Sequence, residues 1–195
     1  MAWDTEKTKS LLLDAATAEF SDFGLAGARV DRIATTAGVN KERIYQYFGK
    51  KDELFGIVLA RQLAAVMDEV SITGEGIDAV VGYAGRVFDY QVAHPELARL
   101  TFWEGLERDE PTALETRVAG GDGKVRRLRE ALPALSEDDA RELLLSILTL
   151  CDGWQVLRTM DRVYTGTTER SSKRNAARRR AVLAMIEAHT RELVG

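Results

Sequence analysis

The sequence predicts an all-α protein of about nine helices. Apolar residues recur at spacings of three and four along most of the chain, and no stretch sustains the apolar-polar alternation typical of a strand. The 195 residues include only three prolines, while the helix-favouring residues Ala, Leu, Glu and Arg are frequent. At 45% hydrophobic and 30% charged residues, the chain has the composition of an ordinary globular protein.

The N-terminal residues predict three helices. The first helix should run from about Asp4 or Thr5 to Phe23, because Gly24 is a typical residue at a helix end. Two short helices should follow, separated by Gly38, which can adopt the positive φ that a tight turn needs. Apolar residues of these short helices share one face each: Val30, Ile33, Ala34 and Ala37 in one, and Ile44 and Phe48 in the other. With Asn40 as a plausible N-cap of the second, this pattern predicts a helix-turn-helix.

The middle of the chain predicts three further helices. A long amphipathic helix should begin near Lys50 and end around Ser71, before the break at residues 72–76. The next helix should cover residues 77–93. Pro95 should start the one after it, which runs to about Arg108, since proline fits only the first turn of a helix.

The C-terminal part predicts three more helical segments. Pro111 should open one of them, interrupted by a loop or kink at residues 120–123, where three of four residues are glycine. Ser136 is placed as the N-cap of a long helix that reaches about Arg162. The last helix should run from Thr168 or Glu169 to Val194.

Positive charge is concentrated at the helix-turn-helix. The whole chain has a net charge of −4, yet residues 29–51 contain six basic and two acidic residues, a local charge of +4. Lysine, arginine, tyrosine and glutamine side chains occupy the faces of the second short helix that its apolar residues leave free. A local cationic, hydrogen-bonding surface in an acidic protein indicates a specific nucleic-acid contact instead of a general coating of nucleic acid.

In this region the sequence resembles the TetR (tetracycline-repressor-type) family of transcription regulators. The resemblance covers roughly residues 8–56. The matching positions are Leu12, Leu13, Ala15, Ala16, Phe20, Gly24, Ile33, Ala34, Gly38, Val39, Tyr45, Phe48, Lys51 and Leu54. The chain departs from the family pattern at Arg29, Glu42, Arg43 and Tyr47, so the resemblance does not supply an operator sequence.

The resemblance implies a division into a helix-turn-helix DNA-binding domain, residues 1–49, and a helical effector-binding and dimerisation domain, residues 50–195. It implies a ligand-responsive repressor that binds a palindromic operator in double-stranded DNA as a homodimer and is released by a small, largely apolar molecule. The alternative is a dimeric DNA-binding regulator that is controlled by a protein partner and has no small-molecule effector. An all-helical enzyme is a remote third, because no catalytic triad, phosphate-binding glycine loop or metal-ligand spacing is present in the sequence.

The resemblance also suggests which residues touch DNA. Tyr45, Tyr47 and Lys51 are expected at phosphates, and Arg29 is a further phosphate candidate. Glu42 has two alternative roles: its carboxylate either accepts a hydrogen bond from a cytosine or stabilises the positive N-terminal end of its own helix. Residues expected to face base edges in the major groove are Lys41, Glu42, Arg43 and Gln46, with Arg43 suited to guanine and Gln46 to adenine.

The C-terminal helices supply candidates for a pocket and a dimer face. For the pocket they are the aromatic residues Phe88, Phe102, Trp103 and Trp154, with Arg99, Glu104 or Asp152 as polar partners. Apolar stripes on the last two long helices would either pair with a second copy, as the resemblance implies, or be buried within one chain. These stripes are Leu144, Ile147, Leu148, Cys151, Trp154 and Leu157, and Val182, Met185, Ile186, His189 and Leu193.

Several functions are not expected from the sequence. The single cysteine, Cys151, lies in an apolar run and is interpreted as a buried core thiol. No cofactor or metal site is expected from two isolated histidines and one cysteine. The basic run at residues 173–180 is interpreted as the solvated face of an amphipathic helix. Because no signal peptide or membrane-spanning segment is recognised, a cytoplasmic protein without membrane contact is predicted.

Overall fold

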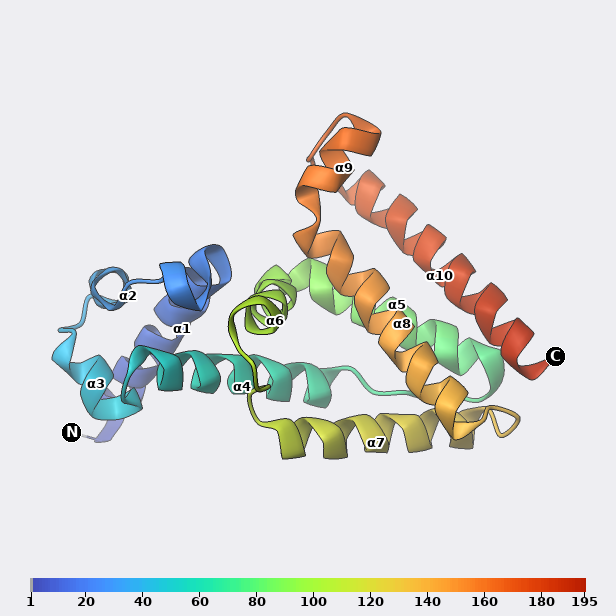
Figure 1. Ribbon diagram of the computed structural model, residues 1–195, viewed down its shortest axis with the longest axis horizontal. Helices are drawn as coiled ribbons and strands as arrows, with labels where there is room; N and C mark the ends of the chain where they lie inside the picture. Colours follow the sequence, from blue (N-terminus) through green and yellow to red (C-terminus); the bar gives the residue numbers. More distant parts are fainter. Residues whose placement is uncertain (1) are drawn as a thin grey trace. The chain divides into compact units, whose positions relative to one another are not determined.

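Ten helices and no strand make up the regular secondary structure of residues 2–195, which the computed structural model describes, with side chains from Thr5 onward (Figure 1). The prediction of an all-α fold is confirmed, with one helix more than expected. The helices are α1 (Ala2–Gly27), α2 (Val30–Ala37), α3 (Glu42–Phe48), α4 (Lys51–Glu69), α5 (Gly76–Ala93), α6 (Pro95–Glu107), α7 (Leu114–Ala131), α8 (Glu137–Val156), α9 (Arg158–Thr165) and α10 (Ser172–Val194).

The chain forms two compact units. Unit 1 contains the residues up to Ala65 together with Arg99–Leu114, and unit 2 contains Val66–Ala98 together with Glu115–Gly195. Unit 1 therefore extends beyond the helix-turn-helix to most of α4 and α6. The helices α4 and α6 each have residues in both units.

The core of unit 1 is built by α1 to α4. Phe20 of α1 and Phe55 of α4 are fully buried and meet edge to face, with ring centroids 5.2 Å apart. This arrangement is favoured by the ring quadrupoles. The other fully buried apolar residues of these helices are Leu12, Ala16, Ile33, Ile44, Leu54, Val58 and Leu59, and α6 adds Leu100 to the core of this unit.

The C-terminal end of α1 is fixed by contacts with α6. Gly24 interrupts the helix with φ 68° and ψ −178°, a combination that essentially only glycine adopts. The indole of Trp103 lies against this glycine and donates a hydrogen bond from Nε1 to the Ser21 carbonyl, at 3.1 Å. The next backbone amides, of Leu25 and Ala26, donate to Oε2 of Glu107, at 2.5 and 3.1 Å. The predicted end of the first helix at Gly24 is thus a sharp turn closed by α6.

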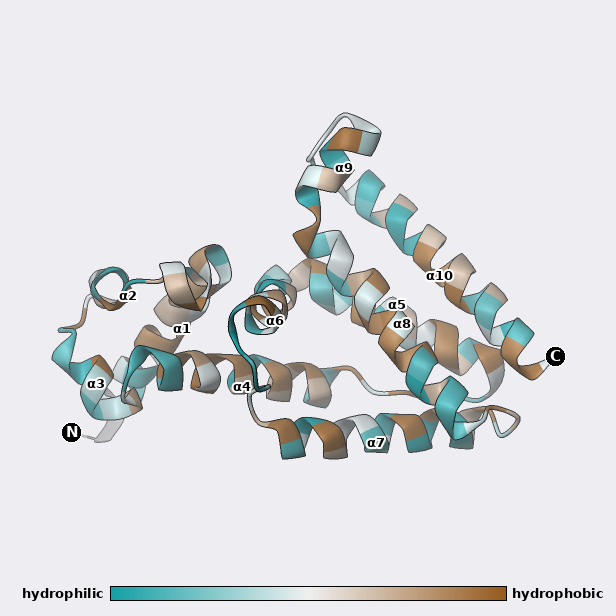
Figure 2. Ribbon diagram, in the orientation of Figure 1, coloured by the Kyte–Doolittle hydropathy of each residue, from teal (hydrophilic) through white to brown (hydrophobic). Residues whose placement is uncertain are grey.

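Unit 2 is organised around α5, which packs against both α8 and α10 (Figure 1). Colouring by hydropathy shows α8 and α10 as helices with both apolar and polar residues along their length (Figure 2). Their apolar residues that face α5 are excluded from solvent. The buried residues of these three helices include Tyr83, Val87, Phe88, Leu143, Ile147, Cys151, Val182 and Ile186, so the prediction of a buried thiol is confirmed.

The predicted loop or kink at residues 120–123 is wrong, because α7 is continuous from Leu114 to Ala131. Glycine in a helix costs about 1 kcal/mol relative to alanine, a preference that tertiary contacts readily outweigh. Lys124 Nζ donates to the Val70 carbonyl at 2.8 Å, and Arg127 Nε donates to the Ile72 carbonyl at 3.2 Å. At Gly120 a β-carbon would lie 2.6 Å from Cε of Met67, so here glycine permits close packing.

Three predicted boundaries in the second half of the chain are also wrong. The helix that starts after Ser136 ends at Val156, where Leu157 has ψ 48°, and α9 follows as a separate helix. The last helix begins at Ser172, since Ser171 accepts a hydrogen bond from the Arg174 amide, at 3.4 Å, as its N-cap. Pro111 precedes α7 without starting it. The predicted N-cap at Ser136 is confirmed by its hydrogen bond from the Asp139 amide, at 3.1 Å.

Replacing Gly24 by alanine should lower the free energy of unfolding by at least about 1–3 kcal/mol, because the backbone conformation is strained for alanine. The added β-carbon would also lie 2.8 Å from the Trp103 ring. As the matched control, Gly105→Ala in α6 should raise stability by about 0.5–1 kcal/mol, since alanine favours the helix. A β-carbon at Gly105 meets no atom within 4 Å. Urea unfolding of both variants measures this difference, and equal effects would contradict it.

Candidate DNA-binding surface

The helix-turn-helix is present as predicted, in α2, the following turn and α3. Gly38 has the left-handed φ of 66° and ends α2, while the Val39 amide donates to the Ala34 carbonyl at 3.0 Å. The predicted N-cap at Asn40 is wrong, because Lys41 holds that position without a side-chain cap bond, but Asn40 Oδ1 accepts a hydrogen bond from the Glu42 amide at 3.4 Å within the turn. These bonds fix the direction in which α3 leaves the turn.

The start of α2 depends on a glutamate that the sequence analysis did not single out. The side chain of Glu19 is 9% exposed, and its Oε1 accepts hydrogen bonds from the Arg29 amide at 2.7 Å and from Arg32 Nε at 2.8 Å. A signal for it exists in the sequence, because Glu19 falls on the apolar face of α1, between Ala16 and Phe20. A carboxylate at such a position needs a partner of opposite charge.

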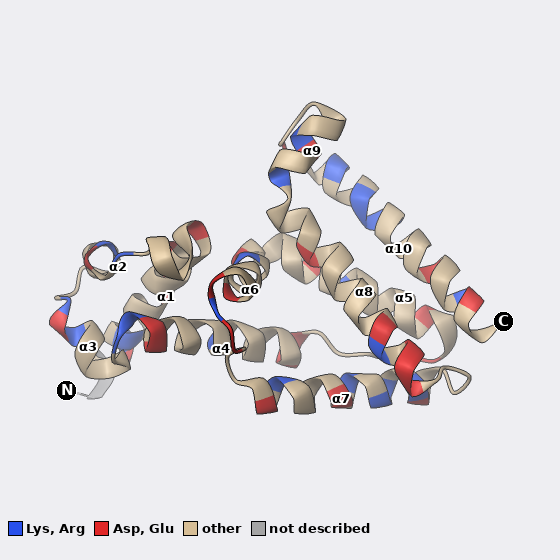
Figure 3. Cartoon of the chain, viewed as in Figure 1, with Lys and Arg blue, Asp and Glu red and all other residues tan. Residues whose placement is uncertain are grey.

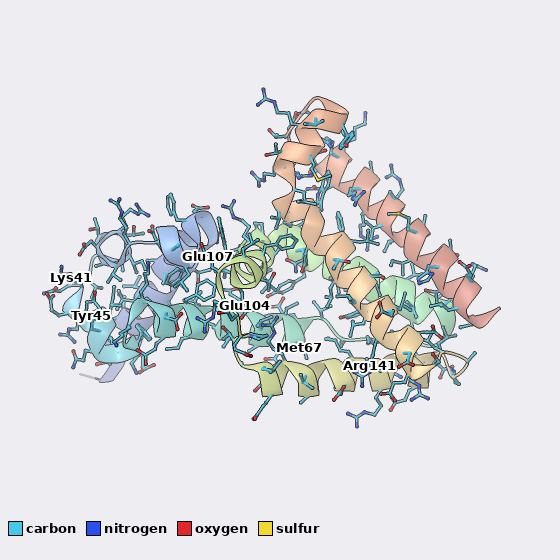
Figure 4. All side chains as sticks on the ribbon, in the orientation of Figure 1. Lys41, Tyr45, Met67, Glu104, Glu107 and Arg141 are labelled. Atoms are coloured by element: carbon cyan, nitrogen blue, oxygen red, sulfur yellow. The ribbon has the colours of Figure 1, made fainter. Side chains whose placement is uncertain are left out.

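One face of α3 is buried and the other is open to solvent. Ile44 and Phe48 are buried, as predicted from their spacing. Tyr45 is 51% exposed, and Figure 4 shows it with Lys41 at the outer edge of the helix-turn-helix. Figure 3 shows basic residues in the turn before α3 and at the start of α4. The predicted DNA-contacting residues that are exposed are Arg29, Lys41, Glu42, Arg43, Tyr45 and Gln46, whereas Tyr47 and Lys51 are half-buried.

Two of these cations have partners within the helix-turn-helix. Lys41 Nζ lies 3.2 Å from Oδ1 of Asp31, and the hydrogen bond and charge of this carboxylate raise the pKa of Lys41. Arg43 donates from Nη1 to the hydroxyl of Tyr47 one turn later in α3. A guanidinium presents five N–H donors, so this bond leaves Arg43 most of its capacity for another acceptor.

Lys51 is tied to the end of α1. Its Nζ donates to the carbonyls of Ala26, at 3.3 Å, and Ala28, at 3.1 Å. An ammonium group has three donors, so one remains for a further acceptor. The structure therefore places the Lys51 charge at the start of α4, close to the loop that enters α2.

The four aromatic residues predicted to line a pocket are divided between the two units. Phe88 and Trp154 belong to unit 2, and Phe102 and Trp103 to unit 1. Phe88 is fully buried, Trp103 lies against Gly24, and Trp154 donates from Nε1 to Oδ1 of Asn175 at 3.0 Å. Within either unit, the structure brings together no more than two of the four.

The three polar candidates have distinct partners. Arg99 Nε donates to the Ser21 carbonyl at 2.7 Å, and Oε1 of buried Glu104 accepts from the Thr112 amide at 2.6 Å. Asp152 Oδ1 accepts a hydrogen bond from Gln91 Nε2 at 2.6 Å. Burial raises the pKa of Asp152 to about 7. Arg99 and Glu104 thus support unit 1, while Asp152 lies with α5 in unit 2.

Most of the apolar stripe proposed for dimerisation lies inside unit 2. Val182 and Ile186 are fully buried, as are the α8 residues Ile147 and Cys151. Three large apolar side chains are instead exposed on α8 and α10. This set consists of Leu145 at 55%, Met185 at 45% and Leu148 at 36% exposed, of which Leu148 and Met185 were part of the predicted stripes.

Among the described residues, no helix combines the length and apolar character that crossing a bilayer requires.

Family comparisons match both parts of the chain. The model for bacterial regulatory proteins of the tetR family matches residues 12–57, and the model for the tetracyclin repressor-like C-terminal domain matches residues 79–188.

Individual relatives agree with these matches. The HTH-type transcriptional repressor SCO4008 of Streptomyces coelicolor is 37% identical, over 91% of this chain and 97% of its own length. The repressor NicS of Pseudomonas putida is 32% identical, over 77% of this chain and 76% of its own.

Solved structures share the fold. The regulator SCO4942 from Streptomyces coelicolor is similar with a TM-score of 0.75 and 31% identity, covering 93% of this chain and 97% of its own. A TetR variant from Acinetobacter baumannii, solved in complex with minocycline, has a TM-score of 0.64 at 14% identity and covers 94% of this chain and 97% of its own. The chain therefore belongs to the TetR family, whose members are DNA-binding transcriptional regulators and not enzymes.

Proposed function

We propose that this protein is a repressor that binds a palindromic operator as a homodimer and leaves it when a small molecule binds. The observation that carries the proposal is the open face of α3, where glutamate, arginine, tyrosine and glutamine side chains are exposed while Ile44 and Phe48 are buried, with Lys41 exposed just before the helix. Two relatives that match over most of the chain are themselves named as repressors.

The positions of the side chains suggest separate roles in DNA contact. Arg43 and Gln46 are exposed on α3 and can each form a bidentate pair with a base edge in the major groove. Lys51 and Tyr45 would contact phosphates, which sets the orientation of α3 without reading sequence. Arg29, Lys41, Glu42 and Tyr47 complete the proposed surface.

The proposed dimer face is the solvent-exposed side of α8 and α10 in unit 2. Leu145 and Leu148 of α8 and Met185 of α10 are large apolar groups that the fold leaves in water, although other residues of the same helices are buried against α5. Covering them with a second copy removes apolar surface from water, which favours association. The interface would then lie on the last two long helices, beside the stripe that forms the core.

Release from the operator follows from geometry. Two recognition helices must reach major-groove segments about one DNA turn, ~34 Å, apart. An effector changes the bound fraction only if it binds the DNA-incompetent arrangement more tightly, by about 5.5 kcal/mol for a switch from 1:99 to 99:1. Because α4 and α6 have residues in both units, they are the elements through which such a change would reach the helix-turn-helix.

A regulator without a small-molecule effector remains the second candidate, since the aromatic pocket residues are split between the units. A thermal-shift screen with apolar and charged compounds distinguishes the two. A compound that raises the melting temperature and weakens DNA binding supports the effector, whereas a protein-partnered regulator would respond to none.

Arg43→Ala should relax sequence preference, with a loss of about 1–3 kcal/mol of discrimination at one operator position. Lys51→Ala should weaken binding to all DNA sequences and reduce the salt slope by about 1. Fluorescence anisotropy with operator and scrambled DNA, at several salt concentrations, measures both effects. Selection from a random DNA pool supplies the operator.

The control for charge alone is Lys173→Ala, an exposed lysine at the start of α10 in unit 2. It should leave both affinity and salt slope unchanged. Because Lys51 also bonds to carbonyls of α1, melting curves must show that Lys51→Ala remains folded. Equal losses of affinity and selectivity in the Arg43 and Lys51 variants would refute the proposed division of roles.

The double substitution Leu145→Glu and Met185→Glu should convert the dimer to a monomer, since it places two carboxylates in each copy of the proposed interface. Operator affinity should fall with it. Light scattering measures the mass, and Leu106→Glu, at a 75% exposed position of α6, is the matched control. A dimer that survives the double substitution would place the interface elsewhere.

A further inference from the structure

Unit 2 contains a cluster of arginines around the indole of Trp154. The guanidinium of Arg170 stacks on this ring with its carbon 3.5 Å from the ring centroid, and those of Arg174 and Arg178 lie at 5.4 and 5.8 Å. The side chains come from α8, from α10 and from the loop before α10. The position of Trp154 is fixed by its hydrogen bond to Asn175, at 3.0 Å.

Among the residues with described side chains, the carboxylate paired with these cations is that of Asp161 in α9. Its Oδ1 accepts hydrogen bonds from Arg174 Nη2 and from the Thr165 hydroxyl, while its Oδ2 lies 3.1 Å from Arg170 Nη1. The side chains of Asp161 and Arg170 are only 7% and 14% exposed. Three guanidinium groups and one carboxylate leave this largely buried site with a net charge of +2.

The cluster has donors that Asp161 does not satisfy. Nε, Nη1 and Nη2 of Arg170 and Nε of Arg178 are buried and have no acceptor in hydrogen-bond geometry within the described part of the chain. Buried polar groups are nearly always hydrogen-bonded, and buried charges are paired. Burial lowers the pKa of Arg170; the charge of Asp161 opposes this, whereas Arg158, Arg174 and Arg178 reinforce it. Oδ2 of Asp161 is likewise buried without a donor in hydrogen-bond geometry, although it lies 3.1 Å from Arg170 Nη1, so the existing pair is poorly aligned and the cluster holds more positive than negative charge.

The residue that now supplies the carboxylate belongs to a helix with little apolar anchoring. No residue of α9 is buried, and Val163 and Tyr164 are 73% and 80% exposed. The contacts of Asp161 with Arg170 and Arg174 therefore provide much of what holds α9 to this site. Moving this helix aside would cost little buried apolar surface. Figure 3 shows that most basic residues of α10 lie on the half next to α9.

We propose that this arginine cluster is a binding site for a small organic carboxylate, which takes the place of the Asp161 side chain between Arg170 and Arg174. A carboxylate is favoured because the site already holds one, and because planar guanidinium groups bind carboxylates through paired hydrogen bonds. A second carboxylate on the ligand would also supply acceptors for Arg178, and an aromatic ring beside the carboxylate would offer its π face to that guanidinium. The proposal concerns unit 2 alone and does not depend on DNA binding.

The test is isothermal titration calorimetry of the full chain, without DNA, using succinate, benzoate and acetate. Sodium chloride at equal ionic strength is the reference. Wild-type protein should bind at least one of these carboxylates saturably, with one site per chain. Asp161→Asn removes the internal competitor and should tighten this binding about tenfold. Arg170→Gln should abolish it.

Arg179→Gln is the matched control on α10. Its guanidinium is paired with Asp89 through bonds of 2.8 and 2.9 Å and should not contribute, so this variant should bind like wild type. Circular dichroism checks folding, and if Arg170→Gln is unfolded, Arg178→Lys should still weaken binding. No saturable binding to wild type or to Asp161→Asn would overturn the proposal and leave Asp161 as a clamp for α9. Unchanged binding in both the Arg170 and Arg178 variants would overturn it as well.

Discussion

The position of the helix-turn-helix depends on the hydrogen bonds that the backbone amides and carbonyls at the C-terminal end of α1 make with side chains of other helices. A helix end leaves backbone groups without partners inside the helix, and the sharp turn at Gly24 adds free amides. Glu107 of α6 accepts the amides of Leu25 and Ala26, and Lys51 of α4 donates to the carbonyls of Ala26 and Ala28. One carboxylate and one ammonium group thus join three helices at the point where the chain enters α2. A chain rearrangement in α4 or α6 would act directly on this junction.

Local electrostatics reconcile an acidic protein with DNA binding. Ion pairs inside unit 1 hold some cations in place. Glu19 pairs with Arg32, and Asp31 pairs with Lys41. The exposed residues of α3 keep donors that the protein itself does not use. The exposed Lys41–Asp31 pair contributes little to stability, so its main effect is to orient the Lys41 side chain. Orientation in advance reduces the entropy lost on binding.

Unit 2 uses its polar residues differently. Asp152 and Gln91 form a hydrogen bond beside the apolar core. Arg170, Arg174 and Arg178 gather over Trp154, and Asp161 pairs with the first two. Polar groups at such depth reduce stability unless they are fully paired. The incomplete pairing around Trp154 contrasts with the satisfied backbone at the end of α1. This contrast is what distinguishes a site able to accept a ligand from one that only supports the fold.

The sequence by itself determined the all-α class, the helix-turn-helix and the open face of α3, because helical periodicity and the turn at Gly38 are local properties. It also contained a signal for Glu19, since a carboxylate on an apolar face requires a partner. Only the tertiary structure decided that α7 passes through its glycines, where Met67 packs closely on Gly120, and that α9 separates from α8. It also decided which apolar residues of α8 and α10 are core and which are exposed. These outcomes depend on contacts between residues far apart in the chain, which outweigh local preferences of about 1 kcal/mol per residue.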